Sequence, residues 1–334
     1  MCRFAAATAI YVGFAVYLYQ PYFKNFQAPD YLFVINSSLA SLGCFVLSRR
    51  WIIGFWESLF AGAIYGFGPF VLGLAQFHPS AGFLAATIPW LFCPATFRPR
   101  NKWPWLSVPL SALPFLAIPL FFQTAVHCRL FPISTQTKLH LADLPALLAP
   151  LVMARRGITD ISLIGFYHVP IAALVMGFLM LLAARRLGII VIIALGTILA
   201  FCKSFLEVSP LLWFAVPVLC CSVLVGAGAQ GLARAGSTDK GWVLAVAAVC
   251  GALSIATLLL ATKYFQMFAG LGSGYARLFL DTAKMYILGT IAVTIIFFMA
   301  RAKLRLRWLR LAVLCSAMTL DIFFSARFVV DRIF

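Results

Sequence analysis

The residue types best suited to chemistry gather in the middle of this chain, in a polar stretch at 123–160 that reads QTAVHCRLFPISTQTKLHLADLPALLAPLVMARRGITD. It contains His127, His140 and Asp143, and imidazole and carboxylate groups are the usual acids, bases and zinc ligands of proteins. A helix would place His140 and Asp143 on one face, and His168 could reach them from the next apolar segment. These residues predict an acid–base or metal site, or else the polar side chains of a hydrated loop. Their spacing matches no metal signature, so neither a metal nor another cofactor is expected.

A second hypothesis combines an early acid with the basic residues of the same stretch. Asp30 lies between the first two apolar segments, where enzymes that act on polyprenyl-linked sugars often carry an acid. Arg129, Arg155 and Arg156 would hold the pyrophosphate of such a lipid, because guanidinium groups bind phosphate oxygens in pairs. No paired-acid motif accompanies Asp30, so its alternative role is the N-cap of the helix that follows it.

The third hypothesis concerns acids inside apolar segments. Asp321 follows Arg310 by about 15 Å of helix, which places it near the centre of a bilayer. An acid at that depth is a functional candidate by default, because burying it is costly unless it has a partner. The alternative is a structural ion pair, or a hydrogen bond to a serine or threonine of a neighbouring helix. Glu57 lies only one or two turns into its helix, so we expect its carboxylate to reach back to the membrane surface.

The composition determines what kind of fold must position these residues. Of the 334 residues, 63% are hydrophobic and 10% are charged, whereas a soluble domain is about one quarter charged. The long apolar runs lack the alternation of a β-barrel, so the expected fold class is an all-α polytopic membrane protein. The net charge of +17 is assigned to helix ends at an anionic membrane face. Nucleic-acid binding is not expected, because no basic folded domain could carry it.

About eleven apolar segments are expected to cross the membrane, at residues 4–20, 31–48, 51–75, 80–96, 104–122, 161–183, 187–202, 210–230, 241–262, 283–300 and 311–330. They divide the chain into a first bundle half (1–122), an outer polar cap (123–160) and a second bundle half (161–334). Within the cap, 141–153 is too short to cross about 30 Å of hydrocarbon, and we expect it to be interfacial or re-entrant.

Two of these segments have distinctive small or rigid residues. The third contains Gly62 and Gly66, a spacing that lets helices approach closely. The fifth has a proline every five residues, at 104, 109, 114 and 119, which predicts a kinked helix.

The basic residues predict the orientation of the chain. With the N-terminus inside, 15 of the 26 Lys and Arg residues fall on the inner side, mostly at 49–50, 98–102, 185–186, 234–240 and 301–310, as the positive-inside rule requires. The histidines, most of the acids and the C-terminus then lie outside. We expect anionic lipid to bind the last cluster, through Arg301, Lys303, Arg305, Arg307 and Arg310. Short loops and the lack of a transit peptide favour a bacterial inner membrane.

These features favour a transporter or permease-like protein, or a membrane subunit of a transport complex. The support comes from Asp321, the glycine-containing third segment and the proline-rich fifth segment. Two alternatives stay open. One is an outer-face enzyme that acts on a lipid-linked substrate. The other is a non-catalytic integral subunit of a larger assembly, whose apolar faces bind partner helices.

Overall fold

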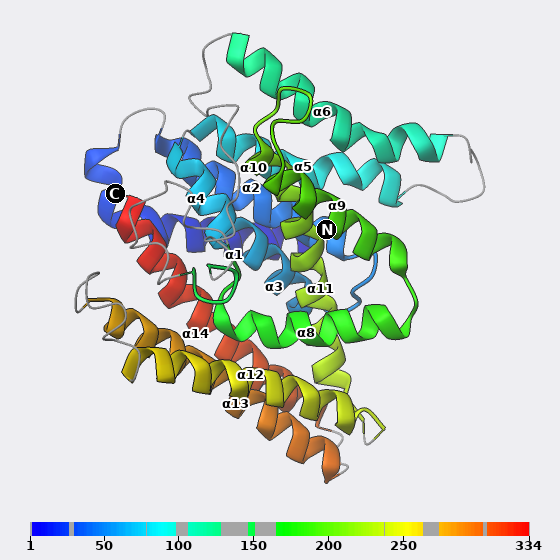
Figure 1. Ribbon diagram of the computed structural model, residues 1–334, viewed down its shortest axis with the longest axis vertical. Coiled ribbons are helices and arrows are strands. Elements are labelled where there is room, and N and C mark those ends of the chain that lie inside the picture. Colours follow the sequence, from blue (N-terminus) through cyan, green and yellow to red (C-terminus); the bar gives the residue numbers. More distant parts are fainter. Residues whose placement is uncertain are drawn as a thin grey trace.

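The computed structural model describes residues 2–26, 30–77, 79–97, 106–127, 146–150, 165–236, 238–262, 274–302 and 306–333. Across these ranges the regular structure is helical, apart from one isolated bridge between Phe205 and Val208. The fold is therefore all-α, as the composition predicts (Figure 1).

The helices follow the apolar segments of the sequence. In chain order they are α1 (Cys2–Tyr19), the 3-10 helix η1 (Gln20–Asn25), α2 (Tyr31–Ser48), α3 (Phe55–Gly66), α4 (Pro69–Phe77), α5 (Pro79–Phe97), α6 (Ser107–His127), α8 (His168–Ala183), α9 (Leu187–Phe201), α10 (Pro210–Trp213), α11 (Ala215–Arg234), α12 (Lys240–Thr262), α13 (Gly274–Arg301) and α14 (Arg307–Ile333). Of the cap, the described residues are 123–127, which end α6, and the short piece 146–150.

Seven helices in the described ranges are long and apolar enough to cross a membrane: Cys2–Lys24, Tyr31–Ser48, Phe55–Leu74, Pro210–Arg234, Lys240–Thr262, Ala276–Arg301 and Arg307–Arg332. Shorter apolar helices lie at Gly82–Phe97, Pro109–Thr124, His168–Ala183 and Leu187–Phe201. This set indicates an integral multi-pass membrane protein in contact with the bilayer. The total of about eleven spans, the inward N-terminus and the bacterial membrane stay predictions.

Helix α11 forms the hub of the bundle. It packs against α8 and α3, and it also contacts α9, α14, α2 and α5. Helices α12 and α13 form a hairpin that lies against α8, and α14 lies beside α13 at the lower part of Figure 1. Helices of the first half therefore meet helices of the second along α3–α11 and α4–α14. The division into two halves and a cap stays a prediction.

Glycine and serine let the central helices approach closely. A Cβ atom on Gly62 or Gly66 of α3 would meet backbone atoms of Ser41 or Ser37 of α2. Likewise, a Cβ atom on Gly228 of α11 would meet the backbone of α8. The predicted role of the Gly62–Gly66 spacing is thus confirmed, because only a hydrogen atom fits where these helices cross.

The third segment is broken, which the sequence analysis did not predict. Instead of one helix over 51–75, α3 ends at Gly66 and α4 begins at Pro69. The cause is local, because Pro69 has no N–H to continue α3 and suits the first position of a new helix. The break lies about 18 Å along α3 from its start, well inside a bilayer about 30 Å thick.

Two other segments differ from prediction in their starts. The segment expected at 161–183 is helical only from His168, and 161–164 lie outside the described residues. The segment expected at 283–300 begins at Gly274, because the mixed sequence before 283 continues the helix.

The proline-rich segment lies at the edge of the bundle. Helix α6 packs chiefly against α5, and Leu116 and Leu120 are 67% and 69% exposed. Pro114 and Pro119 lie inside this helix. The helix therefore has one exposed face, while Pro114, Ile118 and Phe122 lie on its buried face.

Candidate functional site

The most distinctive polar group of the interior is a carboxylate with several hydrogen-bond donors. Asp321 of α14 and His168 of α8 are completely buried, and His168 Nδ1 lies 3.0 Å from Asp321 Oδ1. The backbone N–H of Val169 donates to Asp321 Oδ2 at 2.6 Å. The hydroxyl of Ser325, one turn along α14, donates to Asp321 Oδ1 at 3.0 Å. Asp321 is thus partnered on both oxygens, as a buried charge requires.

The start of α8 brings these donors together. Tyr167 has an extended backbone, and the helix begins at the next residue. The first N–H groups of a helix have no partner within it, and they attract negative charge. Asp321 supplies both the acceptor and the charge. Pro170 fits this first turn because its missing N–H needs no partner.

Gly165 allows the chain to enter this turn. Its φ of 156° favours glycine, and a Cβ atom there would collide with the carbonyl oxygen of Ala146. The described piece of the cap therefore packs directly against the entry to α8.

Two buried tyrosines surround the pair. The ring of Tyr286 meets the His168 ring edge to face, with centroids 5.2 Å apart, and its hydroxyl donates to the carbonyl of Leu148 at 2.5 Å. The hydroxyl of Tyr167 donates to the carbonyl of Phe67 at 2.6 Å. Phe67 lies at the break between α3 and α4, so Tyr167 satisfies a carbonyl that the break leaves without a helical partner.

Distances along the helices place these groups at similar depth. From the ends that carry Arg307 and Arg185, Asp321 lies about 21 Å along α14 and His168 about 24 Å along α8. Together with the break at about 18 Å along α3, this defines one buried layer of the bundle, made of Phe67, Tyr167, His168, Tyr286 and Asp321.

One nitrogen atom of the buried layer is left without a partner in the part of the chain that the structure describes. His168 Nε2 is buried and has no hydrogen-bond partner among the described residues. With Asp321 ionised, Nδ1 carries the proton and donates to the carboxylate, which leaves Nε2 as a buried acceptor.

A second polar network joins the helices at the end of the bundle that carries Arg49, Arg185, Arg234, Arg301 and Arg307, which we term the cationic end. Glu57 is only 1% exposed, and Arg307 Nη2 lies 3.4 Å from its Oε1. As expected, the Glu57 carboxylate folds back toward the start of α3, over Gly54, but it is buried there beside Arg307 instead of exposed at the surface.

Other donors extend this network. Gln230 Oε1 accepts the N–H groups of Ile53 and Gly54 at 2.9 and 3.3 Å, which joins α11 to the start of α3. Arg310 is 5% exposed and donates to the carbonyl of Ala235. Arg310 therefore does not belong to the set expected to contact lipid headgroups. Lys303 and Arg305 of that set lie outside the described residues.

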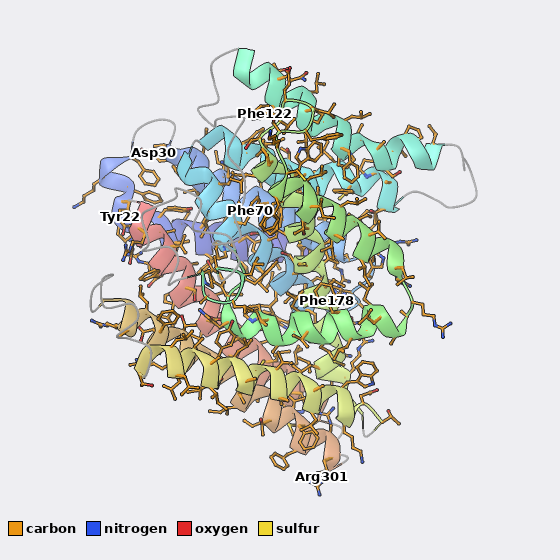
Figure 2. The ribbon with its side chains drawn as sticks, viewed as in Figure 1. Tyr22, Asp30, Phe70, Phe122, Phe178 and Arg301 are labelled. Atoms are coloured by element: carbon orange, nitrogen blue, oxygen red, sulfur yellow. The ribbon has the colours of Figure 1, made fainter. Side chains whose placement is uncertain are left out.

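A third network lies at the opposite end. Asp331 Oδ1 accepts the Tyr22 hydroxyl at 2.5 Å and pairs with Arg327 Nε at 2.9 Å. Arg327 also donates to the carbonyl of Leu18 at 3.1 Å. The last helix is thus tied to the first. Figure 2 shows Tyr22 on one side of the bundle and Arg301 on the other.

No family model, curated protein or solved structure matches this chain. What the buried layer can do therefore has to follow from its own residues.

The structure brings together two candidates that belong to separate hypotheses in the sequence analysis. His168 is a candidate there for a metal or acid–base site and Asp321 for a transport path, yet they form one pair. Of the other acid–base candidates, His127 ends α6, while the placement of its side chain and of His140 and Asp143 lies outside the described residues. Within those residues, no three His, Cys, Asp or Glu side chains form a group that could hold a metal.

Of the residues of the lipid-linked-substrate hypothesis, only Asp30 lies in the described part. Asp30 precedes α2 at the N-cap position, but its side chain makes no capping hydrogen bond. Figure 2 shows it at the edge of the bundle near Tyr22. Arg129, Arg155 and Arg156 lie outside the described residues.

Sequence reasoning misses the tyrosines of the buried layer. Tyr167 has the sequence context of an interfacial aromatic belt, but it is fully buried. Its position directly before His168 is the one feature of the sequence that could have indicated a place in this layer. Ser325 is also missed, although its spacing of four from Asp321 places both on one face of a helix.

Proposed function

We propose that this protein is a membrane transporter whose translocation path passes through the buried layer of Phe67, Tyr167, His168, Tyr286 and Asp321. The observation that carries the proposal is the His168–Asp321 pair, wholly buried at mid-depth beside a broken helix. A buried ionisable pair adds little stability compared with apolar packing, so its presence favours a functional role.

The broken helix α3–α4 supports the same proposal. Irregular backbone at membrane depth is tolerated only where protein buries it or where it lines a cavity. Many secondary transporters place their substrate and ion sites at such breaks, near the bilayer midplane. Here the carbonyl of Phe67 has no partner within a helix and accepts a hydrogen bond from the hydroxyl of Tyr167, the residue next to His168. A movement of His168 would therefore displace Tyr167, its neighbour in the chain, and through it the backbone at the break.

The coupling ion that best fits this site is the proton. His168 Nε2 can accept one proton and Asp321 stabilises the resulting charge. Protonation converts a negatively charged pair into a neutral one. The charge of the layer then changes when a proton binds, and coupling to a solute requires that the layer exchange protons with one side of the membrane at a time.

The networks at the two ends are the contacts that alternating access would break in turn. At the cationic end Glu57 meets Arg307, and at the opposite end Tyr22 and Arg327 meet Asp331. Both networks use α14, the helix that carries Asp321. A rocking motion of α14 would open one end while it closes the other.

Accessibility of position 325 tests this proposal without knowledge of the substrate. Ser325→Cys is introduced into a variant whose native cysteines have been replaced, and right-side-out and inside-out membrane vesicles are treated with a membrane-impermeant maleimide. We expect labelling from both sides, because each open state exposes the layer to water. Ala40→Cys, at a fully buried position of α2 outside the layer, is the matched control and should stay unlabelled.

The opposite outcome is equally clear. If the thiol introduced by Ser325→Cys reacts from neither side, the His168–Asp321 pair is sealed and structural, and the protein is better explained as a non-catalytic membrane subunit. If it reacts from one side only, a one-sided site such as that of an outer-face enzyme replaces the transporter.

A further inference from the structure

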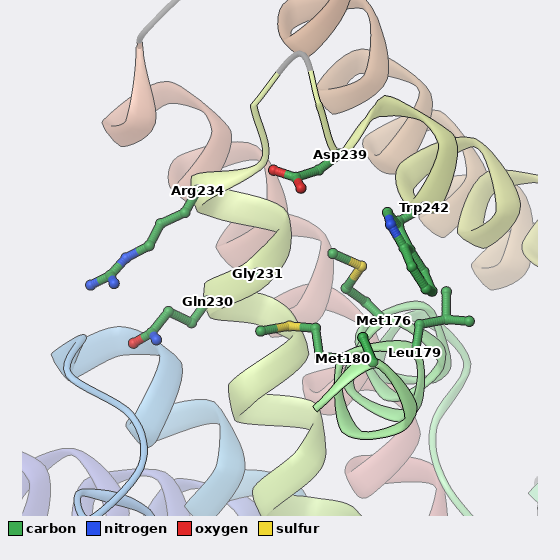
Figure 3. Close-up of a pocket in the computed structure, with 9 residues that line it drawn as sticks. Met176, Leu179, Met180, Gln230, Gly231, Arg234, Asp239 and Trp242 are labelled. Carbon is green, nitrogen blue, oxygen red and sulfur yellow. The ribbon is translucent and has the colours of Figure 1, made fainter. Parts of the chain in front are cut away.

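A pocket opens among three helices at the cationic end, away from the buried layer. Its volume is about 350 Å³, within the usual range of small-molecule sites. Figure 3 shows the residues that line it. Helix α8 contributes Met176, Leu179 and Met180, α11 contributes Gln230, Gly231 and Arg234, and Asp239 and Trp242 come from the start of α12.

The two sides of this pocket differ in chemistry. On one side the flat ring of Trp242 faces the flexible apolar side chains of Met176 and Leu179 (Figure 3). Gln230 and Arg234 project from the other side of α11. Gln230 uses its oxygen to accept the N–H groups of the α2–α3 turn, so its NH2 group remains as a donor. The pocket thus offers apolar contact beside hydrogen-bond donors.

The charge around the pocket is positive. Arg234 is exposed, and no acceptor among the residues that the structure describes lies within hydrogen-bonding distance of its guanidinium. Arg185 and Arg186 follow α8 directly and are also exposed. One acid, Asp239, also lines the pocket, and its Oδ2 accepts the N–H of Gly236 at 2.9 Å.

We propose that this pocket binds an anionic phospholipid. The phosphate of the lipid accepts hydrogen bonds from Arg234 and the Gln230 amide, and the first part of one acyl chain lies between Met176, Met180 and Trp242. Basic pockets between membrane helices are suited to anionic headgroups, and guanidinium groups bind phosphate oxygens with paired hydrogen bonds.

The position of the pocket favours a lipid over a soluble anion. Gln230 lies one turn before the end of α11, and Trp242 lies in the first turn of α12. Tryptophan at helix ends marks the level of the headgroups. A soluble phosphate would need no apolar wall, whereas a phospholipid at this level presents its phosphate and its chain together.

Native mass spectrometry of the purified protein, titrated with phosphatidylglycerol or phosphatidylcholine, tests the proposal. We expect phosphatidylglycerol to be retained preferentially. Arg234→Gln should weaken its binding about fivefold to tenfold, as the loss of one cation near a phosphate predicts. Arg50→Gln, at an exposed position after α2 and outside the pocket, is the matched control and should change nothing.

A second variant tests the acyl chain. A Cβ atom on Gly231 would meet the flexible ends of Met180 and Met176, so Gly231→Leu fills the pocket while those side chains move aside. It should weaken phosphatidylglycerol binding as much as Arg234→Gln does.

Three results would overturn the proposal. Equal losses in Arg234→Gln and Arg50→Gln would mean diffuse surface charge. Unchanged binding in Gly231→Leu would place the chain elsewhere. Competition by glycerol phosphate at the same concentration as the lipid would assign the pocket to a soluble phosphate.

Discussion

The hydroxyl of Tyr167 donates to the carbonyl of Phe67 across 100 positions of sequence, at the point where α3 has ended and α4 has not begun. This bond joins the start of α8 to the break in the third segment. Because His168 directly follows Tyr167 in the chain, Tyr167 connects the His168–Asp321 pair to the break between α3 and α4.

Removal of the Tyr167 hydroxyl should therefore loosen the break. Tyr167→Phe leaves the Phe67 carbonyl without its donor while keeping the ring, so we expect a loss of about 1 kcal/mol in the free energy of unfolding. Thermal unfolding in mild detergent measures it. Tyr17→Phe is the control, since the Tyr17 ring is half exposed, and equal losses in both variants would argue against a special role for Tyr167.

The two members of the buried pair should be energetically coupled. His168→Leu leaves the Asp321 charge without its main partner, so the expected loss in the free energy of unfolding is about 3–5 kcal/mol. The double variant His168→Leu/Asp321→Leu should recover part of that loss, because two apolar side chains replace two charged ones. A double-mutant cycle gives the coupling, and strictly additive losses would show that the pair does not interact.

Glu57 is expected to hold the cationic end closed. Glu57→Gln removes the charge that faces Arg307, which favours the state open at that end. In the Ser325→Cys background, labelling from the cationic side should then become faster and labelling from the other side slower. Asp281→Asn is the control, since Asp281 pairs with Lys284 on the same exposed face of α13. Equal acceleration from both sides would indicate general loosening instead of a gate.

The close crossing of α2 and α3 should tolerate no added carbon. In Gly66→Ala the new methyl group meets backbone atoms of Ser37 and Ser41, so the helices must separate, at a cost of about 1–3 kcal/mol in the free energy of unfolding. Gly13→Ala in α1 is the matched control because nothing lies near its Cβ position. It should be neutral or slightly stabilising. Chemical denaturation in detergent compares the two, and similar losses would contradict close packing as the cause.

The predicted topology can be tested with reporters at the two ends of the chain. Eleven spans place the N-terminus and the C-terminus on opposite faces of the membrane, with the N-terminus inside. A fluorescent-protein fusion folds inside, and an alkaline phosphatase fusion is active outside. We expect fluorescence from the N-terminal fusion and phosphatase activity from the C-terminal one. Both termini on one face would require an even number of spans.

The positions of most helices could be predicted from the sequence, because a long apolar run has few other structures available in a membrane. Helix α2 matches its predicted range, 31–48, at both ends. The break at Gly68 and Pro69 is visible in the residue types, but the high hydropathy on both sides favours one continuous span. The predicted start of a helix is wrong where tertiary contacts determine its first turn, as they do at His168.

The partners within the site could not be predicted in the same way. His168 and Asp321 are 153 positions apart, and no periodicity in either segment reports which faces of α8 and α14 meet. Sequence reasoning identifies both as unusual residues at membrane depth, but assigns them to different hypotheses. The ion pair that buries Glu57 is missed for the same reason, because its partner, Arg307, is separated from it by 250 positions.

The charges carried by α14 bear on how the protein is made. Helix α14 follows its packing partners in the sequence, and it holds Arg310 and Asp321 within its apolar span. On its own, each would oppose entry into the bilayer by about 2.5–3.5 kcal/mol if placed at the centre. Ala235, His168 and the other partners precede it in the sequence, so they are synthesised first. We therefore expect α14 to enter the membrane by docking onto helices that are already inserted, which would make its insertion a checkpoint for correct assembly of all the others.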